Sequence, residues 1–476
     1  MAQPFAEPCD SGVIAAEPCP RLLGRELAPR RRRLVLTACV LASSMAFIDG
    51  SALTVALPKL RASFDANVAS VQWVLNGYVL ALAALTLIGG ALADVYGKAR
   101  MLAVGCIGFG LASAACVVAP SIGWLIALRV VQGVSAAILT PASLALIGAS
   151  YPKEERNAAI GVWAAASALT TAGGPVLGGW LTESFGWPWI FAINPPLALA
   201  TVALLAYAPA DGRAARRFDL TGAAVLAVAL GLIAWALSQI GPGEAGLAND
   251  IMVTAALLLG LAALAGYALW ERASPHPMTP PRLLGNRAFV GLNAATLAIY
   301  GGLAIMFFLL SFDLIDRRGL PPTQAGLAFL PFTLGVGLLS RVFGGLADKV
   351  GARMMLIVGP LGAALAFAWL ALGRNGPLLP GVLAPMTLLG LSFAVLVTPL
   401  TASVMSSVAD ADEGLASGVN NAMSRVAQLV GVALAAGVAS YAAGFRAGMA
   451  VAAVLAAAGA AIMAATLPRV PQEKAR

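Results

Sequence analysis

Charged residues are scarce in this sequence. Asp, Glu, Lys and Arg make up 11% of the 476 residues, whereas hydrophobic residues make up 60% and the mean hydropathy is +0.86. A soluble protein of this length needs far more charged surface to stay in solution. The composition therefore argues against a soluble protein and indicates one whose outer surface is covered by lipid.

The residues that usually carry catalysis or bind metals are also few. There is one histidine, His276, and the five cysteines show neither a C-x-x-C pair nor a Cys/His spacing, so neither a zinc site nor a disulfide framework is indicated. No G-x-x-x-x-G-K-S/T loop is present, which leaves ATP drive unsupported. The net charge of +8 is spread over short loops, and this placement argues against nucleic-acid binding. We therefore expect no catalytic residue, no metal and no cofactor.

Long apolar runs dominate the rest of the chain. A hydrocarbon core of about 30 Å needs about 20 apolar residues per helix, and such runs are too long and too uniformly apolar for barrel strands. The predicted fold is an all-α membrane protein with fourteen transmembrane helices. The predicted spans are residues 34–57, 71–93, 101–119, 122–147, 157–181, 190–209, 220–240, 251–270, 289–312, 324–346, 354–372, 380–402, 415–438 and 446–467.

The placement of Lys and Arg predicts the orientation. If the N-terminus is cytoplasmic, 22 of the 30 basic residues fall in cytoplasmic segments, six fall outside, and two, Arg129 and Arg425, fall inside spans. Cytoplasmic loops of membrane proteins carry such an excess of basic residues. We therefore expect a multi-pass protein of the inner membrane with both termini in the cytoplasm.

A short motif occurs twice. The pattern G-x-L-A-D-x-x-G runs from Gly90 to Gly97 and again from Gly344 to Gly351, each time at the cytoplasmic end of the second span of a six-span block. One interpretation is a tight helix connection that arose independently twice. The matching positions favour an internal repeat, which is typical of carriers that rock about a site near the midplane of the membrane.

The repeat predicts how the chain is divided. Two like-oriented six-helix bundles flank a linker that carries two inserted transmembrane helices. The predicted segments are a cytoplasmic tail over residues 1–33, the first bundle over 34–209, the linker over 210–288, the second bundle over 289–468 and a cytoplasmic tail over 469–476.

Ionisable residues inside spans are costly and are candidates for function. Asp49 lies about 22 Å from the inner face and Arg129 about 10 Å from the outer face, counting about 1.5 Å per residue. In a core of about 30 Å these depths agree, so we expect the two side chains to pair. A proton on Asp49 would release Arg129, which is a requirement for proton coupling. The alternative is a purely structural clamp between two helices.

Three other features are less specific. We interpret Asp313 as a solvated loop charge at the outer end of its span, with a second proton site as the alternative. Arg425 lies near the middle of span 13 and has no acid in its own span, so its partner is left open. In span 5, Gly174, Pro175, Gly178 and Gly179 favour a hinge or a seal between the halves, because proline bends a helix and glycines allow close packing.

These motifs together resemble the major facilitator superfamily, specifically its fourteen-span drug/proton antiporter group. The resemblance extends from about Arg33 to Pro468. It is carried by Gly90 to Arg100, Leu125 to Ala137, Gly161 with Gly174 to Gly179, Ile48 to Pro58, Trp73 with Tyr78, Trp189 to Asn194, and Asp219 with Gly222.

The resemblance implies roles for individual residues. Asp49 and Arg129 would couple protons, and Gly174, Pro175, Gly178 and Gly179 would form the hinge of an exporter. Asp94, Gly97 and Arg100, with Asp348 and Gly351 in the second copy, would form a cytoplasmic gate. The chain departs from the usual pattern at Val95, Thr170 and Pro188.

The resemblance also implies a function, namely proton-driven efflux of a small lipophilic drug-like or secondary-metabolite compound by alternating access. The proton gradient would be the energy source, and the partners would be the substrate, protons and membrane lipid. Spans 10 to 14 contain no acid, which favours neutral, weakly acidic or monovalent substrates. A carrier for one physiological solute and a membrane-embedded enzyme or receptor are the alternatives. The sequence leaves open a periplasmic adaptor protein, the oligomeric state and the proton stoichiometry.

Overall fold

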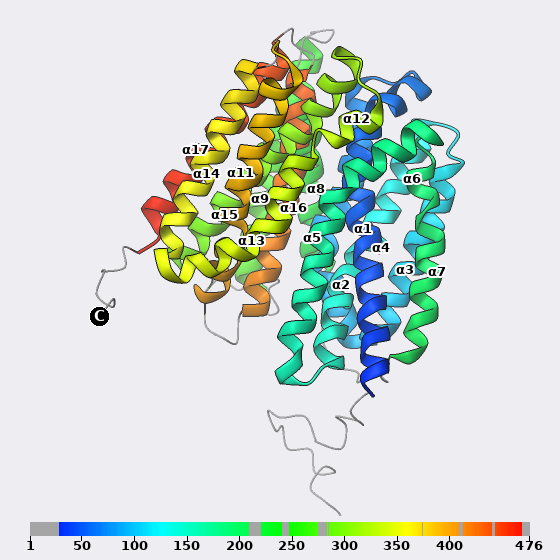
Figure 1. The fold of residues 1–476 in the computed structure, drawn as a ribbon. Helices are drawn as coiled ribbons and strands as arrows, with labels where there is room; N and C mark the ends of the chain where they lie inside the picture. The colour runs from blue at the N-terminus through cyan, green and yellow to red at the C-terminus, as the bar shows by residue number, and fades with distance from the viewer. Residues whose placement is uncertain are drawn as a thin grey trace, which may run out of the picture.

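The chain folds into helices that run roughly side by side (Figure 1). The computed structural model describes residues 28–208, 220–239, 247–274, 283, 285–373, 375–408, 413–439 and 443–468, and these residues contain no strand. All-helical structure is what lipid requires, because a helix satisfies its own backbone hydrogen bonds. The expected all-α fold is confirmed.

The first half consists of helices joined by short connections. They are α1 (Pro29–Phe64), α2 (Val68–Tyr96), α3 (Lys98–Val117), α4 (Ile122–Ser150), α5 (Lys153–Ser184), α6 (Trp189–Ala192), α7 (Asn194–Leu204) and the short turn η2 (Leu205–Tyr207). The helices of the linker are α8 (Leu220–Ser238) and α9 (Leu247–Ala273).

The second half repeats the plan with two short wide turns added. Its elements are α11 (Arg287–Phe312), η3 (Asp313–Arg317), α12 (Pro322–Leu327), α13 (Leu330–Val350), α14 (Ala352–Gly373), η4 (Leu379–Leu383), α15 (Ala384–Ser406), α16 (Glu413–Ala439) and α17 (Gly444–Thr466).

Every predicted span overlaps a helix. Within the described parts of the chain, twelve helices are long and apolar enough to cross a membrane. The two predicted spans outside these twelve coincide with α5, which has 32 residues, and with α8, which has 19. The span count of fourteen stays a prediction.

Close helix crossings organise the first half. α4 packs against α2 and α3, and α1 packs against α5. A β-carbon at Gly133 of α4 would lie 2.4 Å from the carbonyl oxygen of Tyr78 in α2, and one at Gly89 of α2 would lie 1.9 Å from that of Ala137 in α4. Small residues are required where helix backbones come this close in a membrane. These crossings bring the middle of α4 against α2 at the level of Arg129.

The linker hairpin lies across the boundary between the halves. α8 packs against α9, and it also contacts α2 of the first half and α16 of the second. Leu230 and Ala234 of α8 form a small buried cluster with Leu429 and Ala433 of α16. The inserted pair therefore contacts both six-helix bundles through α8.

The repeated motif has the same backbone shape in both halves. Gly97 separates α2 from α3 with φ 101°, and Gly351 separates α13 from α14 with φ 93°. A side chain is strained at such φ values, which explains glycine at both positions. The side chains of Asp94 and Asp348 lie outside the described part of the structure, and the gate role of both copies stays a prediction.

Candidate functional site

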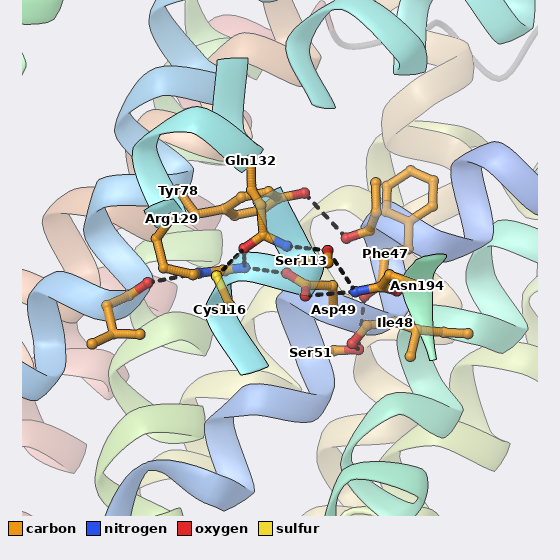
Figure 2. Close-up of polar contacts among 12 residues, drawn as sticks. Phe47, Ile48, Asp49, Ser51, Tyr78, Ser113, Cys116, Arg129, Gln132 and Asn194 are labelled. Atoms are coloured by element: carbon orange, nitrogen blue, oxygen red, sulfur yellow. Dashed lines mark hydrogen bonds and ion pairs between the residues drawn. The ribbon is translucent and has the colours of Figure 1, made fainter. Parts of the chain in front are cut away.

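Asp49 of α1 and Arg129 of α4 form a buried ion pair (Figure 2). The guanidinium Nη1 donates to the Asp49 Oδ2 atom, and both side chains are 0% exposed. The agreement of their depths predicted this contact from the sequence. Because both charges are buried away from water, each is compensated by the other, and removing either side chain would leave a buried charge without its counter-ion.

Further contacts hold the guanidinium in place. Arg129 Nε donates to the carbonyl oxygen of Val74 at 2.9 Å, and Nη1 also donates to Gln132 Oε1 at 2.9 Å. The guanidinium lies over the ring of Tyr78 at 4.3 Å and near that of Phe191 at 5.7 Å. Its Nη2 atom is buried without a hydrogen-bond partner. Arg129 is therefore oriented on most sides but keeps one unused donor.

The carboxylate has a second contact of its own. Asn194, at the start of α7, donates from Nδ2 to Asp49 Oδ1 at 3.2 Å and to Ser113 Oγ at 3.2 Å. Ser113 of α3 also accepts from Gln132 Nε2 at 2.6 Å. The network thus joins α1, α3, α4 and α7 around one carboxylate, as Figure 2 shows.

Aromatic and sulfur groups complete the walls of this network. The Tyr78 hydroxyl donates to the carbonyl oxygen of Ala46 at 3.1 Å, and the Cys116 thiol donates to Gln132 Oε1 at 3.5 Å. The buried thiol of Cys116 therefore takes part in the polar network. Within the described residues, no group of three His, Cys, Asp or Glu side chains could hold a metal ion.

Sequence reasoning found the charged pair but missed part of its surroundings. Gln132 and Asn194 stood in the family motifs without a role of their own, and Ser113 and Cys116 were not singled out as site residues. Their spacing of three residues puts Ser113 and Cys116 on one face of an apolar helix. A polar pair on one face of a transmembrane helix is the signal that would have identified them.

The glycine motif of α5 forms close contacts on two sides. A β-carbon at Gly178 would lie 2.3 Å from the Ala52 carbonyl oxygen of α1, within the first half. One at Gly179 would lie 2.2 Å from the Pro322 carbonyl oxygen of α12, and one at Gly326 would lie 2.3 Å from that of Pro175. The motif is therefore the place where α5 and α12 of opposite halves meet. Its role as a hinge stays a prediction.

Two polar contacts lie at the same end of the molecule, which is the predicted outer side. Glu183 accepts a hydrogen bond from the Thr323 backbone N–H at 3.0 Å, and Arg61 pairs with Asp316 at 3.0 Å. Hydrogen bonds from the side chain and the backbone of Thr323 lower the pKa of Glu183. The halves are thus joined where α1 and α5 end, near α12 (Figure 1).

The interpretation of Asp313 as a solvated loop charge is wrong. Asp313 is 4% exposed and forms ion pairs with Arg317 and Arg318. The reason is the wide turn η3, which continues α11 and places both arginines against the carboxylate. Arg318 also donates to the Gly376 carbonyl oxygen at 3.1 Å, which ties this turn to the segment between α14 and η4.

Arg425 contacts the opposite half of the molecule. It donates to Gln428 Oε1 at 3.2 Å, one turn further along α16, and its guanidinium lies 5.6 Å from the ring centre of Phe47 in α1. The side chain is partly exposed. The partner that the sequence left open is thus an aromatic ring and a neutral amide.

Family comparison identifies the class of protein. The model of the Major Facilitator Superfamily matches residues 39–310 and again residues 292–476. The chain belongs to this superfamily. The resemblance seen in the sequence motifs is confirmed, and the protein is a multi-pass membrane transporter rather than an enzyme.

Several curated relatives of this transporter are about one-third identical to it. The multidrug resistance protein Stp of Mycobacterium tuberculosis is 33% identical over 413 residues, covering 85% of this chain and 75% of the relative. The puromycin resistance protein pur8 of Streptomyces alboniger is 33% identical, with 85% and 81% covered. The cephamycin export protein CmcT of Amycolatopsis lactamdurans is 34% identical, with 84% of each chain covered.

Solved structures confirm the fold. The peptide transporter POT in complex with sulfate superposes with a TM-score of 0.68 at 16% identity, covering 92% of this chain and 94% of the other. The D-xylose-proton symporter superposes with a TM-score of 0.67 at 15% identity, covering 92% and 98%. The major facilitator fold, expected from the sequence, is therefore present in this transporter.

Proposed function

We propose that this transporter exports small lipophilic compounds, drug-like molecules or secondary metabolites, from the cytoplasm in exchange for protons. The observation that carries the proposal is the fully buried pair of Asp49 and Arg129. The relatives support the direction of transport and the type of cargo, because their names describe resistance to or export of antibiotics.

The pair supplies a site for the exchanged proton. A proton on Asp49 would cancel the charge that holds Arg129, and the guanidinium would then seek other acceptors. Gln132 and the Val74 carbonyl already accept from it. The hydrogen bonds of Asn194 with Asp49 and Ser113 would change as well, so that one proton would rearrange contacts on four helices. Such a rearrangement would change the relative stability of two conformations of the transporter, and proton coupling requires this dependence.

The second part of the proposal is alternating access between two bundles. In the structure the halves meet through α5 and α12 and through the Arg61–Asp316 pair. We infer that this is the closed outer face of a carrier whose termini lie in the cytoplasm, embedded in the cytoplasmic membrane. Opening this face would break those contacts, and the gate motifs at Gly97 and Gly351 would close the opposite face.

Transport into inverted membrane vesicles tests this proposal. Vesicles with an acidified lumen are given neutral Nile red, cationic ethidium and anionic pyrenebutyrate. The wild-type protein should accumulate at least one of these probes, and a protonophore should abolish the accumulation. Asp49→Asn should lose it at an equal amount of protein, whereas Asp250→Asn, an exposed acid of α9, should keep it. Unchanged uphill accumulation by Asp49→Asn would refute the coupling role.

The same vesicles separate a broad exporter from a carrier of one solute. A broad exporter should accumulate more than one member of a set of chemically unrelated lipophilic probes. Transport of none of them, by a protein that still confers growth on one nutrient, would favour the carrier for a specific physiological solute.

A further inference from the structure

Arg425 differs from Arg129, the other arginine that the sequence places inside a span. Its contacts are Gln428 and the ring of Phe47, and neither carries a charge. Glu413 begins the same helix, but the offset of twelve residues corresponds to about 18 Å along the axis. No described carboxylate lies within ion-pair distance of this guanidinium. A cation at this depth is costly and marks a functional site.

Exposure separates Arg425 from the buried pair. Arg129 is 0% exposed, whereas Arg425 is partly exposed although it lies in the middle of its helix. The partly exposed side chain therefore lies at the boundary between the halves, where it contacts Phe47 of the first half. The charges of Asp49 and Arg129 cancel one another, so among the described residues Arg425 supplies the uncompensated positive charge at this depth.

Aromatic rings surround this cation on helices of both halves. Phe47 of α1 packs edge-on against Trp163 of α5 at 6.4 Å, and Tyr300 of α11 packs edge-on against Phe393 of α15 at 6.0 Å. Phe47, Trp163 and Tyr300 are partly exposed. Tyr300 lies within electrostatic range of Arg425. The surroundings offer apolar contact area around one positive group, which is the usual composition of a site for an amphipathic small molecule.

We propose that Arg425 binds the anionic group of the transported compounds and that these compounds are lipophilic monoanions, carboxylates above all. The guanidinium has donors in a planar fork that matches a carboxylate in two parallel hydrogen bonds. The rings of Phe47, Trp163 and Tyr300 would contact the lipophilic body. This inference rests on the proposed export function and names its substrate class.

The energetics of transport agree with this class. Export of a monoanion in exchange for an entering proton moves net positive charge into the cell. A membrane potential that is negative inside therefore drives the exchange together with the pH gradient. A monovalent cation exported for one proton would be repelled by Arg425 and would gain nothing from the potential, because that exchange moves no net charge.

A binding measurement with a matched pair of probes tests the assignment. Purified protein in lipid nanodiscs is titrated with pyrenebutyrate and with its uncharged primary amide, which share the same ring system. The wild-type protein should bind the carboxylate at least about tenfold more tightly, because a hydrogen bond to a charged group is lost in the amide. Arg425→Gln should bind both probes alike. Arg425→Lys should keep part of the preference, because it retains the charge without the fork.

The control is an arginine of the same half. Arg446 is exposed at the start of α17, and Arg446→Gln should keep the wild-type preference. The assignment is overturned if the wild-type protein binds both probes equally, fails to bind the carboxylate, or if Arg425→Gln keeps the preference. If Arg425→Gln does not fold, the wild-type comparison of the two probes and the Arg425→Lys variant still decide.

The outcome is distinguishable from failure of the proposed function. Gradient-driven accumulation of Nile red that is lost in Asp49→Asn, together with equal binding of the two pyrene probes, would retain proton-driven export and reject the role of Arg425. Preferential binding of the carboxylate without any gradient dependence of transport would retain the role of Arg425 in binding and reject proton-driven export.

Discussion

Two intramembrane arginines show how differently the halves of this transporter use charge. Arg129 lies in the first half with a carboxylate, an amide and a backbone carbonyl as acceptors, and it is fully buried. Arg425 lies in the second half, partly exposed, with an amide and an aromatic ring. A charge that is paired and buried can respond to a proton, whereas a charge without a counter-ion can accept an anionic ligand.

Polar contacts between α11 and α16 of the second half support this contrast. Asn420 of α16 donates to Asn293 Oδ1 at 3.2 Å and to Thr296 Oγ1 at 2.9 Å, both in α11. These groups are neutral, and the described ion pair of Asp313 lies at the end of α11 rather than in its middle. The first half therefore carries the group that we propose to titrate, and the described part of the second half carries these neutral contacts and Arg425, which has no described counter-ion.

The largest expected effect comes from breaking the buried pair. Arg129→Ala leaves Asp49 buried without its counter-ion, and the free energy of unfolding should fall by about 3–5 kcal/mol. Thermal unfolding of the purified protein measures this change. The double variant Asp49→Ala with Arg129→Ala should recover most of the stability, because no charge is then stranded. Additive losses in the double variant would show that the two residues do not act as a pair.

A smaller effect is expected at the contact that joins the halves. A β-carbon at Gly179 would lie 2.2 Å from the Pro322 carbonyl oxygen, so Gly179→Ala should destabilise the closed outer face by about 1–3 kcal/mol. Labelling of a cysteine introduced near the outer end of α1 measures the population of the open face. Gly173→Ala is the matched control on the same helix, because nothing lies within 4 Å of its β-carbon. Equal labelling of both variants would contradict the role of the glycine motif in closing the outer face.

Removal of the second arginine should change stability far less than removal of the first. Arg425→Gln removes a cation that has no described counter-ion, so we expect a change within about 1 kcal/mol in either direction. Thermal unfolding of this variant beside Arg129→Ala tests the contrast. A loss as large as that of Arg129→Ala would show that Arg425 has a structural partner and would weaken its assignment to substrate.

The smallest effect concerns acid pH at the outer face. The contact with Thr323 lowers the pKa of Glu183 below its ordinary value of 4.5. The stabilising carboxylate form is thus fully present above that ordinary value and is lost as the pH falls through the lowered pKa. Glu183→Gln should remove this acid-dependent opening and leave neutral-pH transport nearly unchanged. Cysteine labelling over a pH series compares the two proteins, and an identical acid response would contradict the role of Glu183.

Much of the fold was predictable because lipid restricts the choices. Apolar runs long enough to span the membrane allow only helices, and the distribution of basic residues predicts which loops are cytoplasmic. The pairing of Asp49 with Arg129 followed from counting residues along two helices. In contrast, the contact of Arg425 with Phe47 depends on how the two bundles pack, and no pattern within either helix encodes it. Asp313 was misjudged because its partners lie in the irregular turn η3.

The most direct test of the central claim is to observe the proton on Asp49. Infrared difference spectra between neutral and acid pH report the C=O stretch of each carboxyl group that becomes protonated. The account predicts a band for a buried protonated carboxyl in the wild-type protein that is missing in Asp49→Asn. Identical spectra for the two proteins would contradict the claim that Asp49 gains and loses a proton.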